Sequence, residues 1–330
     1  MIANYLKIVL RNLLKRKAFT AINIFGLAIG VAVCLLIGKY IVFESGFDRY
    51  HKNSKRIYRV VSSFYTQGVK DEYDGYDLGP ELAATFPEIK GFCRIHGNGS
   101  LVSFNEHDKK ARHRERRILY VDNSFLEIFS FEIFKANGAT PLLNANSVVI
   151  TETIAKKYFG QQDPVGKVIQ LHDGWTPGLY EISAVIQDVP ENSHFAFDIL
   201  LPMQALLQTD FYRNQHQRWD NFHTYLLLME NTRVADLSTK IPSFVRGYSG
   251  NDKEIGQNAS LEFQKLTDIH YSPDLNNPES HLTTIYLFGS IAVFVLLIAW
   301  INYINLSTAR AAERAKEVGV KKLLVYLESS

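Results

Sequence analysis

The sequence predicts an α+β domain flanked by two transmembrane α-helices. Residues 18–38 and 280–309 contain no charged side chain, and each run is longer than the ~20 apolar residues that a helix needs to cross the hydrocarbon core. The segment between them has mixed charge and frequent turn residues, as expected of a water-exposed domain. The mean hydropathy of −0.08 is an average over these two kinds of segment.

The first 18 residues place cationic and apolar side chains on opposite faces of a helix. Lys7, Arg11 and Lys15 fall on one face, and apolar residues such as Leu6 and Leu10 fall on the other. Residues 1–18 are therefore expected to form a cytoplasmic amphipathic helix on the inner leaflet, with its cations near anionic membrane lipid. A positive flank without defined structure is the alternative.

Residues 19–43 are expected to form the first transmembrane helix. A cleaved signal peptide is disfavoured because the run stays apolar through Val42 and Phe43 and shows no good A-x-A site. Val33 is too bulky for a lipoprotein cleavage box before Cys34. Gly26 and Gly30 form a G-x-x-x-G pattern, which lets two helix backbones approach closely. They are the predicted helix-packing residues, although small residues are also common in such helices without a partner.

The basic residues flanking the apolar runs predict the orientation of the chain. Residues 1–43 carry a net charge of +6 and residues 310–330 carry +2, so the remainder carries −6 within the total of +2. The positive-inside rule places both termini in the cytoplasm and the long central segment outside. The negative central segment argues against nucleic-acid binding.

Residues 44–283 combine strand patterns with short helix patterns. The β-branched and aromatic residues of 56–65 predict a strand, Thr151 and Gly160 delimit a helix over 151–160, and GWTPG (174–178) predicts a hairpin. Further strands are expected at 116–121, 147–150, 223–229 and 259–266, and helices at 80–86 and 234–247. Strands and short helices without a regular βαβ period favour the α+β class.

Residues 284–307 are expected to form the second transmembrane helix, followed by a short cytoplasmic segment over 308–330. Glu313 and Glu317 are four residues apart and share one helix face. Gly319 would let the chain turn and offer its backbone to a partner. A plain juxtamembrane helix with compensating charges is the alternative.

The sequence predicts no enzyme activity, no cofactor and no metal. GQQDPVGKV (160–168) has one residue too many between its glycines for a phosphate-binding loop, and Val168 replaces the required hydroxyl. His107, Asp108 and His113 form the densest histidine cluster, but a metal site needs three or four closely spaced ligands. His194 stands apart beside Asn192 and Ser193. The basic run at 109–117 is interpreted as a solvated hairpin.

Four stretches together resemble the MacB/FtsX-like ABC-transporter permeases. The stretch at 12–37 resembles the opening of such permeases, and those at 147–171 and 180–203 resemble their periplasmic core domain. INYINLSTARAAERAKEVGVKK (301–322) resembles their second membrane helix running into the segment that meets the ATPase. The stretches span nearly the whole chain in the family's order. The resemblance thus implies a MacB-like periplasmic core domain at 44–283, in the cell inner membrane.

The resemblance implies a permease subunit that couples a separate cytoplasmic ABC ATPase to a periplasmic domain, for export or mechanotransmission. ATP hydrolysis is expected on the other subunit. A permease dimer and a periplasmic adaptor or substrate protein are the further partners implied. The family's ATPase contacts map onto Glu313, Glu317, Val318, Gly319, Lys321 and Lys322.

The sequence departs from this family after VGVKK. Such permeases usually continue with a Gly-Ala turn and further membrane helices, whereas LLVYLESS follows here. A truncated permease or a fragment is therefore expected. The alternatives are a two-helix membrane sensor and an envelope scaffold with an exterior ligand-binding or partner-binding domain. A sensor would need a long cytoplasmic output domain, and a scaffold would leave ERAKEVGV unexplained.

Overall fold

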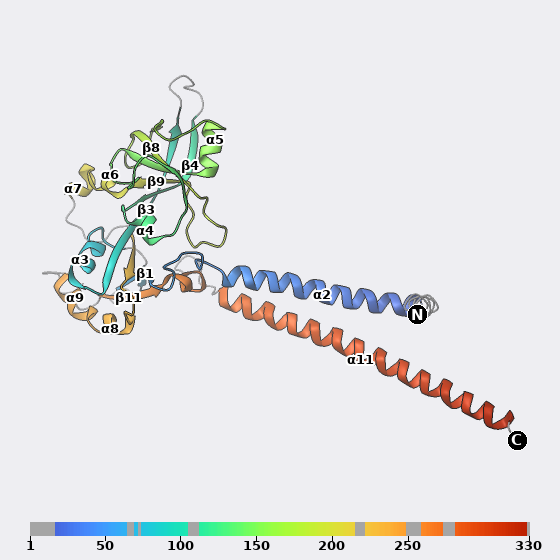
Figure 1. The fold of residues 1–330 in the computed structure, drawn as a ribbon. Coiled ribbons are helices and arrows are strands. Elements are labelled where there is room, and N and C mark those ends of the chain that lie inside the picture. The colour runs from blue at the N-terminus through green and yellow to red at the C-terminus, as the bar shows by residue number, and fades with distance from the viewer. Residues whose placement is uncertain are drawn as a thin grey trace. The chain divides into compact units, whose positions relative to one another are not determined.

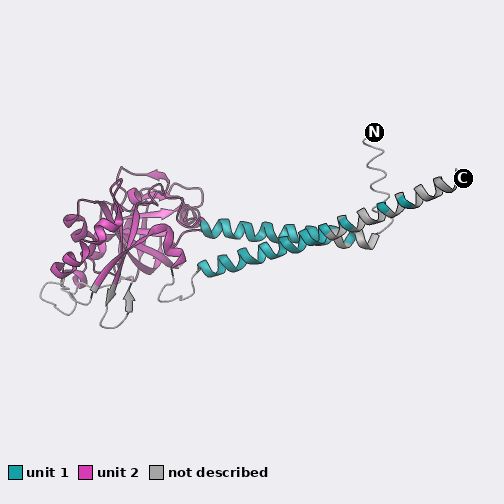
Figure 2. Ribbon diagram, turned by 90° about the horizontal axis from the view of Figure 1, so that it is seen from below, with its two compact units in different colours: residues 1–45, 279–330 teal, residues 46–278 magenta. Residues whose placement is uncertain are grey.

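The computed structural model of the protein describes residues 17–64, 69–71, 74–104, 112–214, 222–248, 259–272 and 281–328. The chain divides into two compact units (Figure 2). The first unit contains Met1–Ser45 and Glu279–Ser330, and the second contains Gly46–Pro278. The two-unit division agrees with the predicted class, in which an α+β domain carries an apolar helix at each end.

The first unit consists of two long helices, α2 (Lys17–Ser45) and α11 (His281–Glu328) (Figure 1). Both contain the apolar runs, in which a helix satisfies every backbone polar group internally. Except for Lys17 and Ala18, the predicted amphipathic helix at 1–18 lies outside the described residues.

The turn expected at Gly319 is absent, because α11 continues through this residue to Glu328. A glycine inside a helix costs about 1 kcal/mol relative to alanine. The alanine, glutamate, lysine and leucine residues on either side of Gly319 are strong helix formers and outweigh that cost.

The second unit is built on a mixed sheet in the order β11-β1-β10-β3-β4-β9-β6-β8-β5. Strand β2 extends the pairing of β1, and β7 bridges β3 and β8. Most neighbours are antiparallel, whereas β4 with β9 and β6 with β8 are parallel. The strands are β1 (Ile57–Phe64), β2 (Val69–Asp71), β3 (Ile89–Ser103), β4 (His113–Val121), β5 (Ile133–Ala136), β6 (Ser147–Thr151), β7 (Val168–Leu171), β8 (Gly178–Ile186), β9 (Ile199–Pro202), β10 (His223–Leu228) and β11 (Ala259–Lys265).

Short helices pack at both ends of this sheet (Figure 1). Helix α3 (Leu78–Thr85) lies near β3 and β10, and α8 (Val234–Ser238) and α9 (Ile241–Tyr248) lie near β11. Near β6 and β9 lie α5 (Glu152–Phe159) and α6 (Met203–Leu207). The remaining helices are α4 (Phe125–Ile128), α7 (Asp210–Asn214) and the 3-10 helix η1 (Leu266–Tyr271). The strand expected at 56–65, the helix at 151–160 and the hairpin at 174–178 are confirmed. The single helix expected at 234–247 is two helices.

Three groups of buried apolar side chains form the core. One lies under α5 and α6, one between α4 and the middle of the sheet, and one beneath α3 and α9. Strand β6 is buried at all five of its positions, which explains its almost continuous apolar sequence SVVIT, because a strand covered on both faces cannot alternate.

Candidate functional site

Helices α2 and α11 pack against each other (Figure 2), and small residues of α2 lie at the contact. A Cβ atom placed on Gly30 would lie 3.3 Å from the Cβ atom of Ala299, and one on Gly26 would lie 3.5 Å from Asn302 Nδ2. The Cys34 thiol lies 3.6 Å from the Ala292 carbonyl oxygen. As residue numbers rise along α2, the residue numbers of the contacted positions on α11 fall. The two helices are therefore antiparallel. Both sequence-predicted packing residues lie at this contact.

The outer surfaces of the two helices are apolar. Windows at Ile24–Ser45 and Leu282–Ile304 are long and apolar enough to span a membrane, and only 11% and 0% of these windows are buried. These helices therefore do not form the core of a soluble domain. A hollow of ≈ 490 Å³ on the helix pair is lined by Leu27, Val293, Leu296, Leu297, Ala299, Trp300 and Tyr303. Such a surface suits lipid tails or another apolar helix.

All six sequence-predicted ATPase contacts lie on the final turns of α11. Gly319 is exposed, and no neighbouring heavy atom lies within 4 Å of a Cβ atom placed on it. Glu313, Glu317 and Lys321 recur every four residues, so their positions follow one line along the helix. Val318 and Lys322 are likewise four residues apart, on the neighbouring line.

In the second unit, a cluster of polar groups fastens the segment that follows α2. We call Gly46, Asp48, Asn192, Ser193 and His194 the anchor cluster. The Asp48 backbone N–H donates to the Asn192 carbonyl oxygen at 3.0 Å, and the Asn192 side-chain amide donates to the Gly46 carbonyl oxygen at 3.0 Å. Asp48 Oδ1 accepts from Ser193 Oγ at 3.3 Å and from the His194 backbone N–H at 3.2 Å.

Asp48 is fully buried and has an unusual conformation. Its φ of 55° lies in the left-handed region, which aspartate tolerates better than most side chains. His194 Nδ1 lies 2.9 Å from Oδ1, at an angle unsuited to a hydrogen bond. Within the described residues Oδ2 has no hydrogen-bond partner, and a buried acceptor left unpaired costs about 1–3 kcal/mol.

Aromatic side chains surround the anchor cluster. His194 Nε2 lies 2.8 Å from the Tyr225 hydroxyl on β10, and the Tyr50 hydroxyl donates to Ser193 Oγ at 3.1 Å. His51 accepts a hydrogen bond from the Ser130 backbone N–H at Nδ1. Burial lowers the pKa of His51 to about 4, with the Asp48 carboxylate opposing the shift and His194 adding to it. His51 is therefore neutral in the folded protein at physiological pH.

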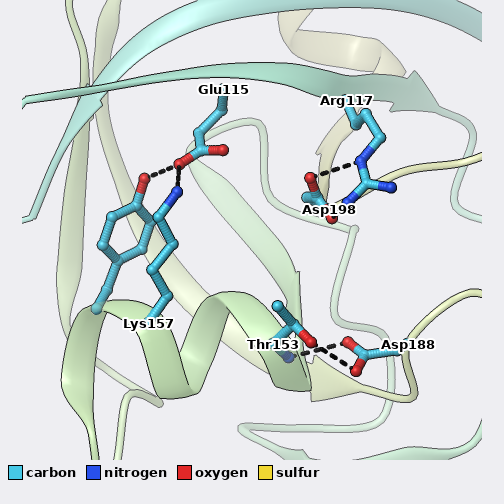
Figure 3. A network of polar contacts seen from close by, with 7 residues as sticks. Glu115, Arg117, Thr153, Lys157, Asp188 and Asp198 are labelled. Atoms are coloured by element: carbon cyan, nitrogen blue, oxygen red, sulfur yellow. Dashed lines mark hydrogen bonds and ion pairs between the residues drawn. The ribbon is translucent and has the colours of Figure 1, made fainter.

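A second polar network holds α5 against the sheet (Figure 3). Glu115 on β4 accepts from Lys157 at 2.6 Å and from the Tyr158 hydroxyl. Burial alone would raise the pKa of Glu115, but hydrogen bonds from Lys157 and Tyr158 outweigh it and lower this pKa. Nearby, Asp188 accepts from the Thr153 backbone N–H and hydroxyl at the start of α5.

The same region contains the ion pair between Arg117 and Asp198, whose two hydrogen bonds are both 2.8 Å long (Figure 3). This pair ties β4 to the segment before β9. The positive charge of Arg117 balances the negative charge of Asp198, and each carboxylate oxygen accepts from its own nitrogen donor. The arrangement in Figure 3 is thus one that fastens secondary-structure elements to one another.

A groove of ≈ 690 Å³ lies beside β7 and β8. Leu143, Val168 and Leu179 supply apolar surface there, and Glu181 supplies a carboxylate. Asn137, Asn144 and Asn146 add amide groups from the loop between β5 and β6. The groove offers mixed apolar and hydrogen-bonding contacts to a molecule outside the chain.

Within the described ranges, no group of three histidine, cysteine or acidic residues is close enough to hold a metal ion. His107 and Asp108 lie outside the described residues. Burial raises the pKa of the Cys93 thiol well above its usual value, so this thiol is unreactive. His194, which looked isolated in the sequence, belongs to the anchor cluster. No local pattern indicates this role, because its partner Asp48 lies far away along the chain.

Comparison with known proteins identifies a matching family model and a similar protein. Residues 20–244 match the family model of the MacB-like periplasmic core domain. The chain is 21% identical over 328 residues to the ABC transporter permease YknZ of Bacillus subtilis, covering 97% of this chain and 77% of the relative.

Among solved structures, a domain of a protein described as a permease, from Porphyromonas gingivalis, is similar with a TM-score of 0.56 and 17% identity. The match covers 69% of this chain and 97% of that domain, and it shows a shared fold. The periplasmic region of MacB from Actinobacillus actinomycetemcomitans gives a TM-score of 0.44 and 8% identity, with 65% of this chain and 90% of that one covered.

Proposed function

Because this chain belongs to the MacB-like periplasmic core domain family, we propose that it is a permease subunit of an ABC-type export or mechanotransmission system. A separate cytoplasmic ATPase binds and hydrolyses ATP, and its movement shifts α2 and α11. The helices then move the periplasmic domain, which acts on a substrate or a partner protein. This chain itself catalyses no reaction.

The continuity of α11 supports this function best. The helix passes from its apolar window at Leu282–Ile304 into the charged segment at 308–328 without a break. A continuous helix transmits a displacement along its axis, whereas a flexible joint after the apolar run would absorb it. The similarity to the permease YknZ over 97% of this chain points in the same direction.

The proposed topology places residues 19–43 and 284–307 in the inner membrane. Both termini are cytoplasmic, with residues 1–18 on the inner leaflet and residues 308–330 at the ATPase, and residues 44–283 are periplasmic. The excess of Lys and Arg before α2 and after the apolar part of α11 supports this orientation.

The proposed partners are the ATPase, a second permease subunit, and a periplasmic adaptor or substrate protein. The apolar hollow around Trp300 on the helix pair suits a membrane helix of the second permease subunit. The groove beside Glu181 suits a periplasmic partner. Membrane lipid covers the remaining helix surface.

Co-purification with the ATPase tests the proposal. Glu317→Lys should weaken the association modestly, since an exposed ion pair is worth about 0–1 kcal/mol. Gly319→Ile should weaken it more, because it adds a bulky side chain where the helix surface is open. Isoleucine also has a higher helix propensity than glycine, so loss of the helix would not explain a lower yield.

Glu328→Lys is the matched control, because it makes the same charge reversal at the end of α11. It should leave the association unchanged. If all three variants retain the ATPase equally, this segment is not the coupling surface. If the unmodified chain binds no ATPase at all, the permease function itself is wrong.

A further inference from the structure

We propose that Asp48 is the positioning residue through which a displacement of α2 reaches the sheet of the second unit. The inference deepens the proposed function and rests on it, because it names the residue that would carry helix movement into the periplasmic domain.

The position of Asp48 in the chain is the first observation. Helix α2 ends at Ser45, and Asp48 follows three residues later. Between them, Gly46 is held by the Asn192 side chain at 3.0 Å. The Asp48 backbone is held by the Asn192 carbonyl at 3.0 Å. A pull on the end of α2 would therefore reach residues 192–194 through these two hydrogen bonds.

The second observation is that Asp48 is locally unfavourable. It is a fully buried carboxylate with one oxygen that has no hydrogen-bond partner among the described residues, and its backbone is left-handed. A residue kept only for stability would avoid both features. In proteins, locally unfavourable features such as these two are expected mainly at functional sites.

The third observation is a route from Asp48 into the sheet. The His194 backbone N–H donates to Asp48. The Nε2 atom of the His194 ring lies 2.8 Å from the Tyr225 hydroxyl. Tyr225 lies on β10, where it pairs with Arg59 on β1 and with Cys93 on β3. A shift of His194 is thus delivered to three adjacent strands.

The test uses the full chain in lipid nanodiscs and needs no ATPase. Cys34 contacts the backbone of Ala292, so the Ala292→Cys variant can be oxidised to cross-link α2 with α11 and reduced again. Hydrogen exchange is then compared between the oxidised and reduced states of one sample. In this background the cross-link should slow exchange at residues 192–194 and at β10 by about threefold or more.

Adding Asp48→Asn to that background should abolish the slower exchange at residues 192–194 and at β10. The amide lacks the negative charge that holds residues 193 and 194. Adding Tyr225→Phe should abolish only the response of β10, because it removes the hydroxyl beyond His194. Asp122→Asn is the control. It removes the charge of a carboxylate that is 15% exposed, pairs with Arg94 at 2.7 Å and lies outside the anchor cluster. The responses of residues 192–194 and of β10 should both persist.

The Tyr225→Phe variant keeps the inference falsifiable if Asp48→Asn fails to fold. Retention of the β10 response in Asp48→Asn or in Tyr225→Phe would overturn the proposal. So would the absence of any response to the cross-link in the background variant. None of these outcomes depends on the ATPase, so failure here is distinguishable from failure of the proposed permease function.

Discussion

Phe47 and His270 lie face to face, with ring centroids 3.4 Å apart and ring planes 5° apart. Phe47 belongs to the segment that follows α2, and His270 belongs to η1, the last element described before α11. The stack therefore joins the beginning and the end of the second unit. In the proposed topology, such a closure would make the two membrane attachment points of the domain move together.

Replacing Phe47 by alanine should destabilise the second unit. Its side chain is only 9% exposed, and removal of a buried phenylalanine costs about 3–5 kcal/mol. Denaturant unfolding of the full chain in detergent measures this loss. Phe134→Ala is the control, because Phe134 is 51% exposed and should change stability by about 0.5 kcal/mol or less. Equal losses for both variants would contradict the role of the stack.

The free energy of unfolding should fall as the pH is lowered from 7 to 5. Burial lowers the pKa of His51 from 6.5 to about 4, so between these values the unfolded chain takes up a proton that the folded chain excludes. The stability contributed by neutral His51 is complete above 6.5 and is lost as the pH falls toward 4. By pH 5 the loss from this group is about 2 kcal/mol.

The variant His51→Phe checks this, because it keeps an aromatic ring and removes the titration. Its unfolding free energy should depend less on pH between 7 and 5. Phe129→Leu alters a ring that contacts His51 and should shift stability without changing its pH dependence. If the unfolding free energy of His51→Phe depends on pH as strongly as that of the unmodified chain, His51 is not the group that causes this dependence.

Gly30→Leu should separate α2 from α11. The first added atom would already lie 3.3 Å from the Ala299 Cβ atom, so the rest of a leucine cannot be placed without moving the helices apart. Oxidative cross-linking between Cys34 and an Ala292→Cys variant should become severalfold slower. Gly38→Leu is the control, because nothing lies within 4 Å of a Cβ atom there. Comparable cross-linking in both variants would argue against close packing at Gly30.

Cysteine labelling should reveal the proposed topology. In a Cys34→Ala background, a membrane-impermeant maleimide should modify Leu143→Cys in intact spheroplasts, since this position is 62% exposed in the second unit. It should modify Ala315→Cys, an exposed position of α11, only after the membrane is permeabilised. Labelling of position 315 in intact spheroplasts would place the end of α11 outside the cell.

Features encoded by local pattern were predictable from the sequence. The two apolar helices follow from charge-free runs, and the end of α5 follows from Gly160, where φ is +59°. In contrast, the 15-residue strand β3 was not expected. It contains Gly97 and Gly99 and has a register shift beside β4, so its pairing depends on partners distant in sequence.

The anchor cluster was unpredictable for the same reason. Asp48 and His194 are 146 residues apart, and no local periodicity connects them. The continuation of α11 through Gly319 was missed because one glycine was weighed alone. The helix propensities of its neighbours, summed over the segment, decide the conformation.

The length of α11 sets the size of the movement it can produce. At 1.5 Å per residue, its 48 residues span about 72 Å. If this helix pivots as a rigid lever within the bilayer, a change in tilt of about 5° displaces one end relative to the other by about 6 Å, well within the range of tilts that membrane helices adopt. A small rotation of α11 would thus be amplified into a stroke larger than the spacing between adjacent β-strands.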